Sequence, residues 1–168
     1  LNSVLLRGVN DDELEAFIAF VRAHDLSLRF IEVMRTNDNS AFFERHHTPG
    51  AAVAAKLEAM GWLPMLRPSG AGPAIDYAQP NAPGRIGIIA PYGKDFCATC
   101  NRLRVSAKGK FHLCLFGEHG IDLRPLLQAD SQLDALVARI AKLTGTKPFA
   151  HHLHDGISGG TPHLASIG

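Results

Sequence analysis

Three cysteines carry the most specific chemical signal in this sequence. Cys97 and Cys100 are three positions apart, and Cys114 follows fourteen positions later. Thiolates are soft ligands that suit zinc or an iron–sulfur cluster. A structural zinc site normally needs a fourth ligand; His112 and His119 are available, but neither gives the spacing of paired zinc knuckles. On spacing alone, zinc and iron–sulfur both stay open, with core thiols that bind no metal as the third interpretation.

Two arginines follow the second cysteine. Arg102 and Arg104 are two positions apart, so a strand would place them on one face. Guanidinium groups bind phosphate through paired hydrogen bonds, which suits a polyphosphate substrate. Three cysteine ligands would leave one iron of a four-iron cluster open to a substrate atom. If the cysteines hold such a cluster, the arginines would place a phosphate site beside it.

A hairpin explains how the third cysteine returns to the first two. The sequence predicts two short strands joined by a turn: Arg102–Ser106, Lys108-Gly109 and Lys110–Cys114. A two-residue turn would pair Cys114 with Leu103, on the face opposite the arginines. A three-residue loop, with Gly109 in the left-handed conformation, pairs Cys114 with Arg102. We predict the three-residue loop, because it gathers sulfur and guanidinium on one side.

The first third of the chain predicts a strand, a helix and a second strand. A strand opens the chain, and Asn10 with Glu13 has the spacing of a helix start. The helix should end near His24, and Leu26–Glu32 alternates as a strand does. One apolar stripe of the helix is expected to be buried: Leu14, Phe17, Ile18 and Val21. Such a unit implies a parallel sheet, so the fold class is α/β.

The rest of the chain predicts further elements. They are a loop over 35–47, a helix from Pro49 to Gly61, strands Ile75–Ala78 and Arg85–Ala90, and a late helix over Ser131–Leu143. In the late helix, Ser131 and Asp134 are expected as a capping pair, and Leu133, Leu136, Val137 and Ile140 as the buried stripe. Proline and glycine become frequent after Trp62. We therefore predict two domains, 1–62 and 63–168.

Composition excludes several classes of protein. The chain has 168 residues, 46% of them hydrophobic and 20% charged, with a formal net charge of +1. This balance argues against a nucleic-acid-binding surface, and no apolar run is long enough for a membrane helix. An odd number of cysteines favours a reducing, cytoplasmic location. The chain begins with Leu1 inside a strand pattern, which favours a fragment of a longer protein.

The cysteine motif resembles that of a known family. Phe96-Cys97-x-x-Cys100-Asn101-Arg102-Leu103-Arg104, then Cys114-Leu115-Phe116, is similar to the second cluster motif of the GTP 3',8-cyclase family. These are radical S-adenosylmethionine enzymes of molybdenum cofactor synthesis. The resemblance extends over Val4–Glu32, with its Arg-Phe-Ile-Glu-x-Met segment, to the glycine-containing C-terminus.

The resemblance implies a role for each matching residue. Cys97, Cys100 and Cys114 would hold the C-terminal [4Fe-4S] cluster, whose open iron binds the guanine of GTP. Four residues would contact GTP: Arg29, Arg102, Leu103 and Arg104. Met34 would lie against S-adenosylmethionine, and Gly168 would belong to a tail with a catalytic role. The implied fold is the last βα units of an incomplete, TIM-like parallel radical SAM barrel over 1–62, followed by a smaller α+β iron–sulfur lobe over 63–168.

The sequence also departs from the family pattern. The N-terminal C-x3-C-x2-C motif, which holds a second [4Fe-4S] cluster and supports cleavage of S-adenosylmethionine, is absent, and the chain ends in Ile167-Gly168 where the family has Ile-Gly-Gly. We therefore expect this fragment to be inactive alone. The full-length enzyme would convert GTP to (8S)-3',8-cyclo-7,8-dihydroguanosine 5'-triphosphate.

The remaining expectations concern partners. The pathway partner implied by the resemblance is the downstream cyclic pyranopterin monophosphate synthase. Strand edges left without barrel neighbours favour self-association, so a homodimer is a further expectation. The alternative is a small zinc-binding interaction domain without catalysis.

Overall fold

The chain forms two compact units. The computed structural model describes residues 1–94, 96–98, 100–117 and 120–158, without the side chain of His154. Unit 1 comprises Leu1–Met34 and Ser40–Asn101, and unit 2 comprises Arg35–Asn39 and the residues from Arg102 onward. These units are defined by contacts between residues and are not the same as sequence domains. The predicted domain boundary between residues 62 and 63 therefore stays a prediction.

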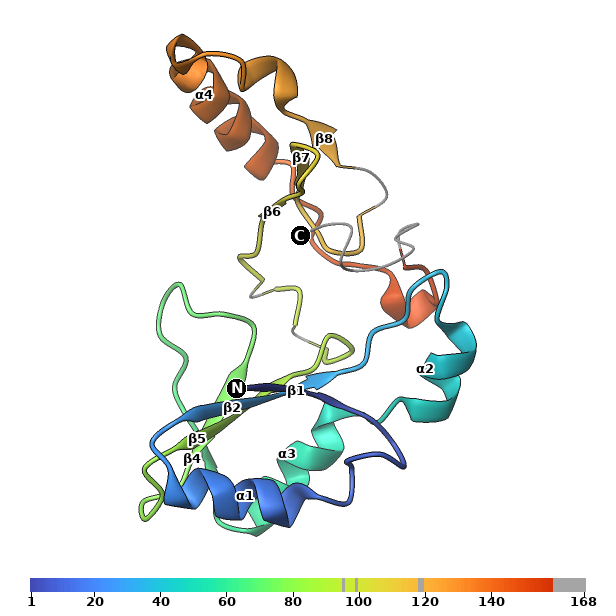
Figure 1. Ribbon diagram of the computed structural model, residues 1–168, viewed down its shortest axis with the longest axis vertical. Coiled ribbons are helices and arrows are strands. Elements are labelled where there is room, and N and C mark those ends of the chain that lie inside the picture. Colours follow the sequence, from blue (N-terminus) through green and yellow to red (C-terminus); the bar gives the residue numbers. More distant parts are fainter. Residues whose placement is uncertain (95, 99, 118–119, 159–168) are drawn as a thin grey trace. The chain divides into compact units, whose positions relative to one another are not determined.

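Unit 1 is built on a five-stranded sheet with the order β1-β2-β5-β4-β3 (Figure 1). Its strands are β1 (Asn2–Leu5), β2 (Ser27–Glu32), β3 (Leu63–Pro64), β4 (Ile75–Ala78) and β5 (Arg85–Ile89), and its helices are α1 (Leu14–Ala23), α2 (Ser40–His46) and α3 (Gly50–Ala59). The pairs β1–β2 and β2–β5 are parallel, whereas β4 pairs antiparallel with both β5 and β3. The predicted strand–helix–strand unit and the mixed α/β class are therefore confirmed.

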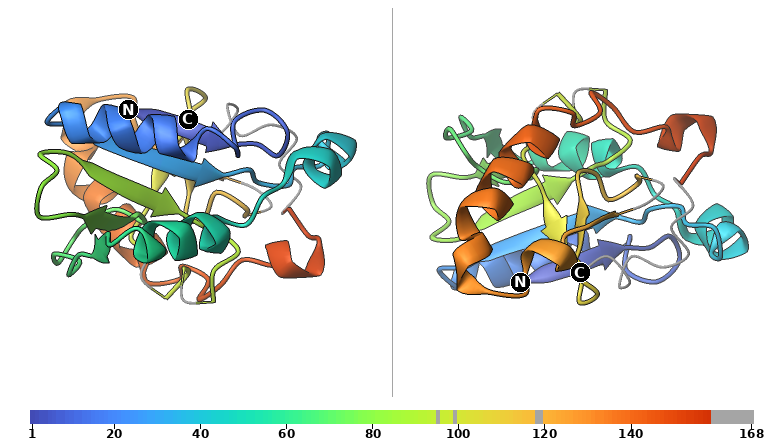
Figure 2. Two further views of the ribbon diagram at one scale, coloured as in Figure 1. Left: turned by 90° about the horizontal axis from the view of Figure 1, so that it is seen from below. Right: turned by 90° about the horizontal axis from the view of Figure 1, so that it is seen from above.

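The core of unit 1 lies between this sheet and two helices. Both α1 and α3 cover the same face of the sheet (Figure 2). Leu28 and Phe30 of β2 point to that face, because alternate side chains of a strand share a face. The predicted stripe of α1 is confirmed: Leu14, Ile18 and Val21 are buried, and Phe17 packs edge-on against Phe30. Arg29 consequently lies on the opposite face.

Two predictions for unit 1 are wrong. Asn10 does not cap α1: its side-chain oxygen accepts from the N–H of Leu6 at 2.9 Å and its amide donates to the carbonyl of Val4 at 3.0 Å. An asparagine side chain that serves the preceding turn cannot also serve the helix, which begins at Leu14 without a side-chain cap. The predicted loop over 35–47 contains the helix α2.

Unit 2 pairs a three-stranded antiparallel sheet with one helix. The strands are β6 (Arg104–Val105), β7 (Lys110–His112) and β8 (Ile121–Asp122), and the helix is α4 (Leu133–Thr144). Phe111, Leu123 and Leu143 form the buried centre, with Leu136 and Ile140 against it. Short 3-10 turns precede and follow the helix: η1 (Arg124–Leu126), η2 (Asp130–Gln132) and η3 (Leu153–Asp155).

The prediction for the late helix holds only in part. Leu136 and Ile140 face the core as expected, but Leu133 and Val137 are 61% and 57% exposed. The predicted capping pair is also wrong. The oxygen of the Gln132 side chain instead accepts from the N–H groups of residues 128 and 129, so it closes the turn before the helix. No helix among the described residues has the length and apolar character needed to cross a membrane.

Candidate functional site

The β6–β7 hairpin has the register that the sequence predicted. Arg104 pairs with His112, and Val105 pairs with Phe111. Continuing this register by two residues aligns Arg102 with Cys114. The ladder itself ends at Arg104–His112, so both strands are shorter than predicted.

The turn of this hairpin depends on a glycine in the left-handed conformation. Gly109 has φ +71°, and its N–H donates to the carbonyl of Ser106 at 2.9 Å, which closes a three-residue loop. A Cβ at Gly109 would lie 2.6 Å from Cγ of Arg124. That side chain is held in place by Asp122, whose carboxylate accepts from the guanidinium at 2.7 Å. The turn therefore disfavours other residue types, chiefly through the left-handed backbone conformation.

The substitution Gly109→Ala tests this account. We expect it to lower the free energy of unfolding by about 1–2 kcal/mol, because L-residues pay that cost in the left-handed region. Gly145→Ala is the matched control: Gly145 has no positive φ, and a Cβ there meets only a carbonyl at 3.4 Å. Urea unfolding measures both variants. Equal effects from the two substitutions would contradict the role assigned to the turn.

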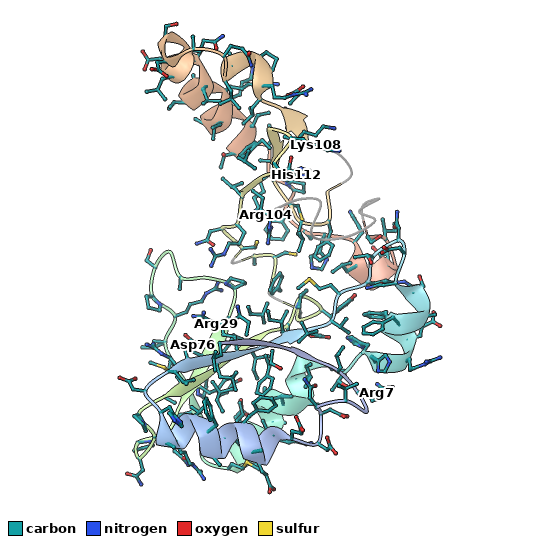
Figure 3. The ribbon with its side chains drawn as sticks, viewed as in Figure 1. Arg7, Arg29, Asp76, Arg104, Lys108 and His112 are labelled. Carbon is teal, nitrogen blue, oxygen red and sulfur yellow. The ribbon has the colours of Figure 1, made fainter. Side chains whose placement is uncertain are left out.

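One face of the hairpin concentrates positive charge. Arg104 and His112 lie on neighbouring strands (Figure 3), and Lys110 shares their face because it is two positions before His112. Burial lowers the pKa of His112, and the charges of Lys110 and Arg104 lower it further. The lowered pKa favours the neutral imidazole, and with Arg104 and Lys110 beside it this face suits an anionic ligand.

A third cation joins the arginine segment. The ammonium of Lys147, just beyond α4, donates to the backbone carbonyl of Arg102 at 2.8 Å. The side chain of Arg102 is exposed, and Leu103 is 38% exposed. Lys147 thus anchors the backbone at residue 102, while the side chains of Arg102 and Leu103 are accessible.

Each cysteine lies in a tight turn and is half-buried. The N–H of Cys100 donates to the carbonyl of Cys97 at 3.1 Å. The next residue, Asn101, ties this segment to a neighbouring loop by donating to the carbonyls of Gly70 and Ala71 at 3.1 and 3.2 Å. The first two cysteines are therefore held in one short, anchored turn of unit 1.

The third cysteine has surroundings that suit a thiolate. The N–H of Phe116 donates to Sγ of Cys114 at 3.4 Å, and a hydrogen bond from a backbone N–H favours negative charge on an acceptor. The carbonyl of Cys114 accepts from Gly117 at 3.3 Å, which completes the turn. A pocket of about 460 Å³ borders Cys114 and His112, with Thr146 and Pro148 also in its wall. This pocket gives the sulfur access to a bound group.

The three cysteines are divided between the two units. Cys97 and Cys100 are in unit 1, and Cys114 is in unit 2. Among the residues described, no three His, Cys, Asp or Glu side chains form a group that could hold a metal ion. The ligand set Cys97, Cys100 and Cys114 stays a prediction, supported by the donor chemistry and by the local turns.

Arg29 lies on the face of the β2 strand that points away from the helices. It pairs with Gly87 of β5, and Gly87 pairs with Asp76 of β4. A Cβ on Gly87 would lie 3.0 Å from Cγ of Arg29 and 2.5 Å from Oδ1 of Asp76. The two charged side chains thus converge over a glycine (Figure 3).

The segment beyond β2 contains the other residue predicted in unit 1. Met34 is half-buried and follows the buried Val33. Glu32, at the end of β2, is 3% exposed and accepts from the N–H of Gly50 at 3.3 Å, at the start of α3, while Nε2 of His47 lies 2.6 Å from the same carboxylate. This pair fixes the strand end against the helix. Gly168 lies outside the described residues.

Three polar residues near these positions were missed by the sequence argument: Lys147, His112 as part of the positive face, and Asp76. Lys147 stands at the start of a tail that is predicted to be irregular. Its neighbours in the sequence therefore do not indicate its contact with Arg102, 45 positions away. Asp76 could have been noticed in the sequence, because it is a charged residue between Ile75 and Tyr77 in a predicted strand.

Comparison with known proteins gives consistent matches. Residues 26–153 match the family model described as Molybdenum Cofactor Synthesis C. The chain is 56% identical over all 168 residues to a GTP 3',8-cyclase of Stenotrophomonas maltophilia (strain K279a), and covers 52% of that protein. It is 51% identical to a GTP 3',8-cyclase of Aeromonas hydrophila, and covers 49% of it. The chain therefore spans about half the length of the curated relatives it matches.

Proposed function

The chain belongs to the molybdenum cofactor synthesis C family, and on this premise we propose that it is the C-terminal part of a GTP 3',8-cyclase. The observations that carry the proposal are the hairpin register, in which Arg104 pairs with His112 and whose continuation would align Arg102 with Cys114, and the N–H to sulfur bond at Cys114. The register favours one site shared by a thiolate and a guanidinium. That combination suits a metal centre next to a nucleotide.

The residues that would hold the metal centre are Cys97, Cys100 and Cys114. The donor set fits an iron–sulfur cluster, because thiolates are its usual ligands and all three cysteines lie in tight, half-buried turns. A [4Fe-4S] cluster bound by three cysteines would supply one iron with an open coordination position. A second [4Fe-4S] cluster and S-adenosylmethionine belong to the proposal for the full-length enzyme, with Met34 against S-adenosylmethionine.

Four residues would bind GTP: Arg29, Arg102, Leu103 and Arg104. Arg102 and Arg104 supply charge for the triphosphate, and Leu103 supplies an exposed apolar surface between them. Lys147 adds a third positive charge beside Arg102. Arg29, on the open face of the five-stranded sheet, would bind the same nucleotide. GTP carries several negative charges, so this set of cations matches its chemistry.

The wider proposal follows the family. The two parallel strand pairs of unit 1 would form the end of an incomplete radical SAM barrel, and residues 63–168 a lobe for the cluster and GTP. The full-length protein would convert GTP to the 3',8-cyclised product in the cytoplasm, as a homodimer, and would supply a downstream cyclic pyranopterin monophosphate synthase. Gly168 would take part in catalysis, and this chain alone would be inactive.

Anaerobic reconstitution with iron and sulfide tests the metal centre. We expect a brown protein with broad visible absorption and about four irons and about four sulfides per chain, as for a cuboidal cluster held by thiolates. The control is the same chain reconstituted with zinc and analysed for metal content. A colourless chain that keeps one zinc ion through gel filtration and rejects iron would instead support the zinc-binding interaction domain.

A further inference from the structure

His112 stands at the end of β7 in unit 2 (Figure 3), opposite a position that has no side chain. Phe111 pairs with Ile121 of β8. Continuing that register by one residue brings Gly120 opposite His112. A Cβ on Gly120 would lie 2.5 Å from both Cε1 and Nε2 of His112. The imidazole therefore occupies the space that a side chain at position 120 would fill.

This imidazole lines the pocket that also borders Cys114. The pocket has a volume of about 460 Å³, and the described residues of its wall all belong to unit 2. The side chain of His112 is half-buried, and its ring makes no hydrogen bond within the described part of the chain. An imidazole that lines a pocket and makes no hydrogen bond there can donate one to a group held in that pocket.

The sulfur at this pocket already has one donor from the backbone. The N–H of Phe116 donates to Sγ of Cys114 at 3.4 Å. Hydrogen bonds to the sulfur atoms of an iron–sulfur cluster are one of the factors that set its reduction potential. They raise the potential, because a donor stabilises the extra negative charge of the reduced form. A second donor at the same pocket would act in the same direction.

We propose that His112 donates a hydrogen bond to a sulfur of the iron–sulfur centre that Cys114 would help to hold, and that Gly120 gives the ring the space for this orientation. The inference rests on the proposed function, because it needs a cluster at this site. His112 is a donor and not a metal ligand. Its loss therefore changes the reduction potential of the cluster and leaves the iron content as it was.

Redox titration of the reconstituted chain, followed by electron paramagnetic resonance, tests this role. His112→Leu removes the donor and should lower the reduction potential by about 59 mV, a tenfold change in the ratio of reduced to oxidised cluster for one electron. His112→Gln keeps an N–H donor and should restore most of that shift. Iron and sulfide content should equal that of the unsubstituted chain in both variants. An unchanged potential in His112→Leu overturns the proposal, and loss of iron in both variants overturns it by making His112 a ligand.

The substitution Gly120→Ala tests the orientation of the ring. The added Cβ would meet the imidazole at 2.5 Å and Cβ of Lys110 at 2.7 Å, so the ring has to move. We expect the potential to fall as in His112→Leu, with no further fall when the two changes are combined. Gly145→Ala is the matched control, because a Cβ there meets only a carbonyl at 3.4 Å, and it should leave the potential unchanged. A further fall in the combined variant would overturn the role given to Gly120.

The same measurements separate this inference from the proposed function. If the unsubstituted chain takes up no iron and sulfide, the proposed function and the role of His112 fail together. If the chain takes up its cluster and the potential of His112→Leu equals that of the unsubstituted chain, only the role of His112 fails. His112→Leu decides the donor role by itself if Gly120→Ala does not fold.

Discussion

Replacing Cys114 by serine is expected to remove most of the iron from the reconstituted chain. Cys114 would be one of only three protein ligands, and a serine oxygen is a poor replacement for a soft thiolate. We expect iron and sulfide to fall to less than about a quarter of the unsubstituted value, with loss of the brown colour. Cys97→Ser and Cys100→Ser should behave alike, because all three sulfurs would hold the same cluster.

A histidine variant separates the two kinds of metal centre. His112 borders the same pocket as Cys114 and pairs with Arg104 in the hairpin. In an iron–sulfur site held by three cysteines, His112→Gln should leave iron content unchanged. In a zinc site that uses an imidazole as the fourth ligand, the same change should release the metal. Loss of iron in His112→Gln equal to that in Cys114→Ser would count against a ligand set made of cysteines alone.

Local sequence rules accounted for the hairpin because few alternatives fit it. Gly109 sets the loop length, since only a glycine readily adopts the left-handed conformation at that position. Loop length then sets the register, and the register sets which residue lies opposite Cys114. The helix α1 and strand β2 were predictable for a similar reason: their apolar periodicity matches the face they bury.

Other features depended on contacts that no local pattern records. Asn10 has the spacing of a helix cap, yet two backbone groups of the preceding turn use its side chain instead. Val137 fits the helical stripe of α4, but the small sheet of unit 2 covers only part of that stripe. The convergence of Arg29 and Asp76 over Gly87 joins residues up to 58 positions apart. Pairing of that range follows from strand order, which the sequence pattern does not contain.

Replacing both Arg102 and Arg104 by alanine is expected to weaken GTP binding by at least about 100-fold, because each charge-assisted hydrogen bond to phosphate contributes about 1.5–3 kcal/mol. Iron content should stay unchanged, since neither side chain would be a cluster ligand. The matched control removes two positive charges from exposed positions of the same unit, Lys108→Ala with Lys142→Ala. That control should change GTP affinity less than about threefold at physiological salt, where separated surface charges are screened. Calorimetric titration with GTP and iron analysis of the same samples distinguish the roles. Equal loss of iron and of GTP binding in the arginine variant would mean that these arginines are structural. Equal weakening of GTP binding in the lysine control would mean that the arginines act only through their contribution to the net charge.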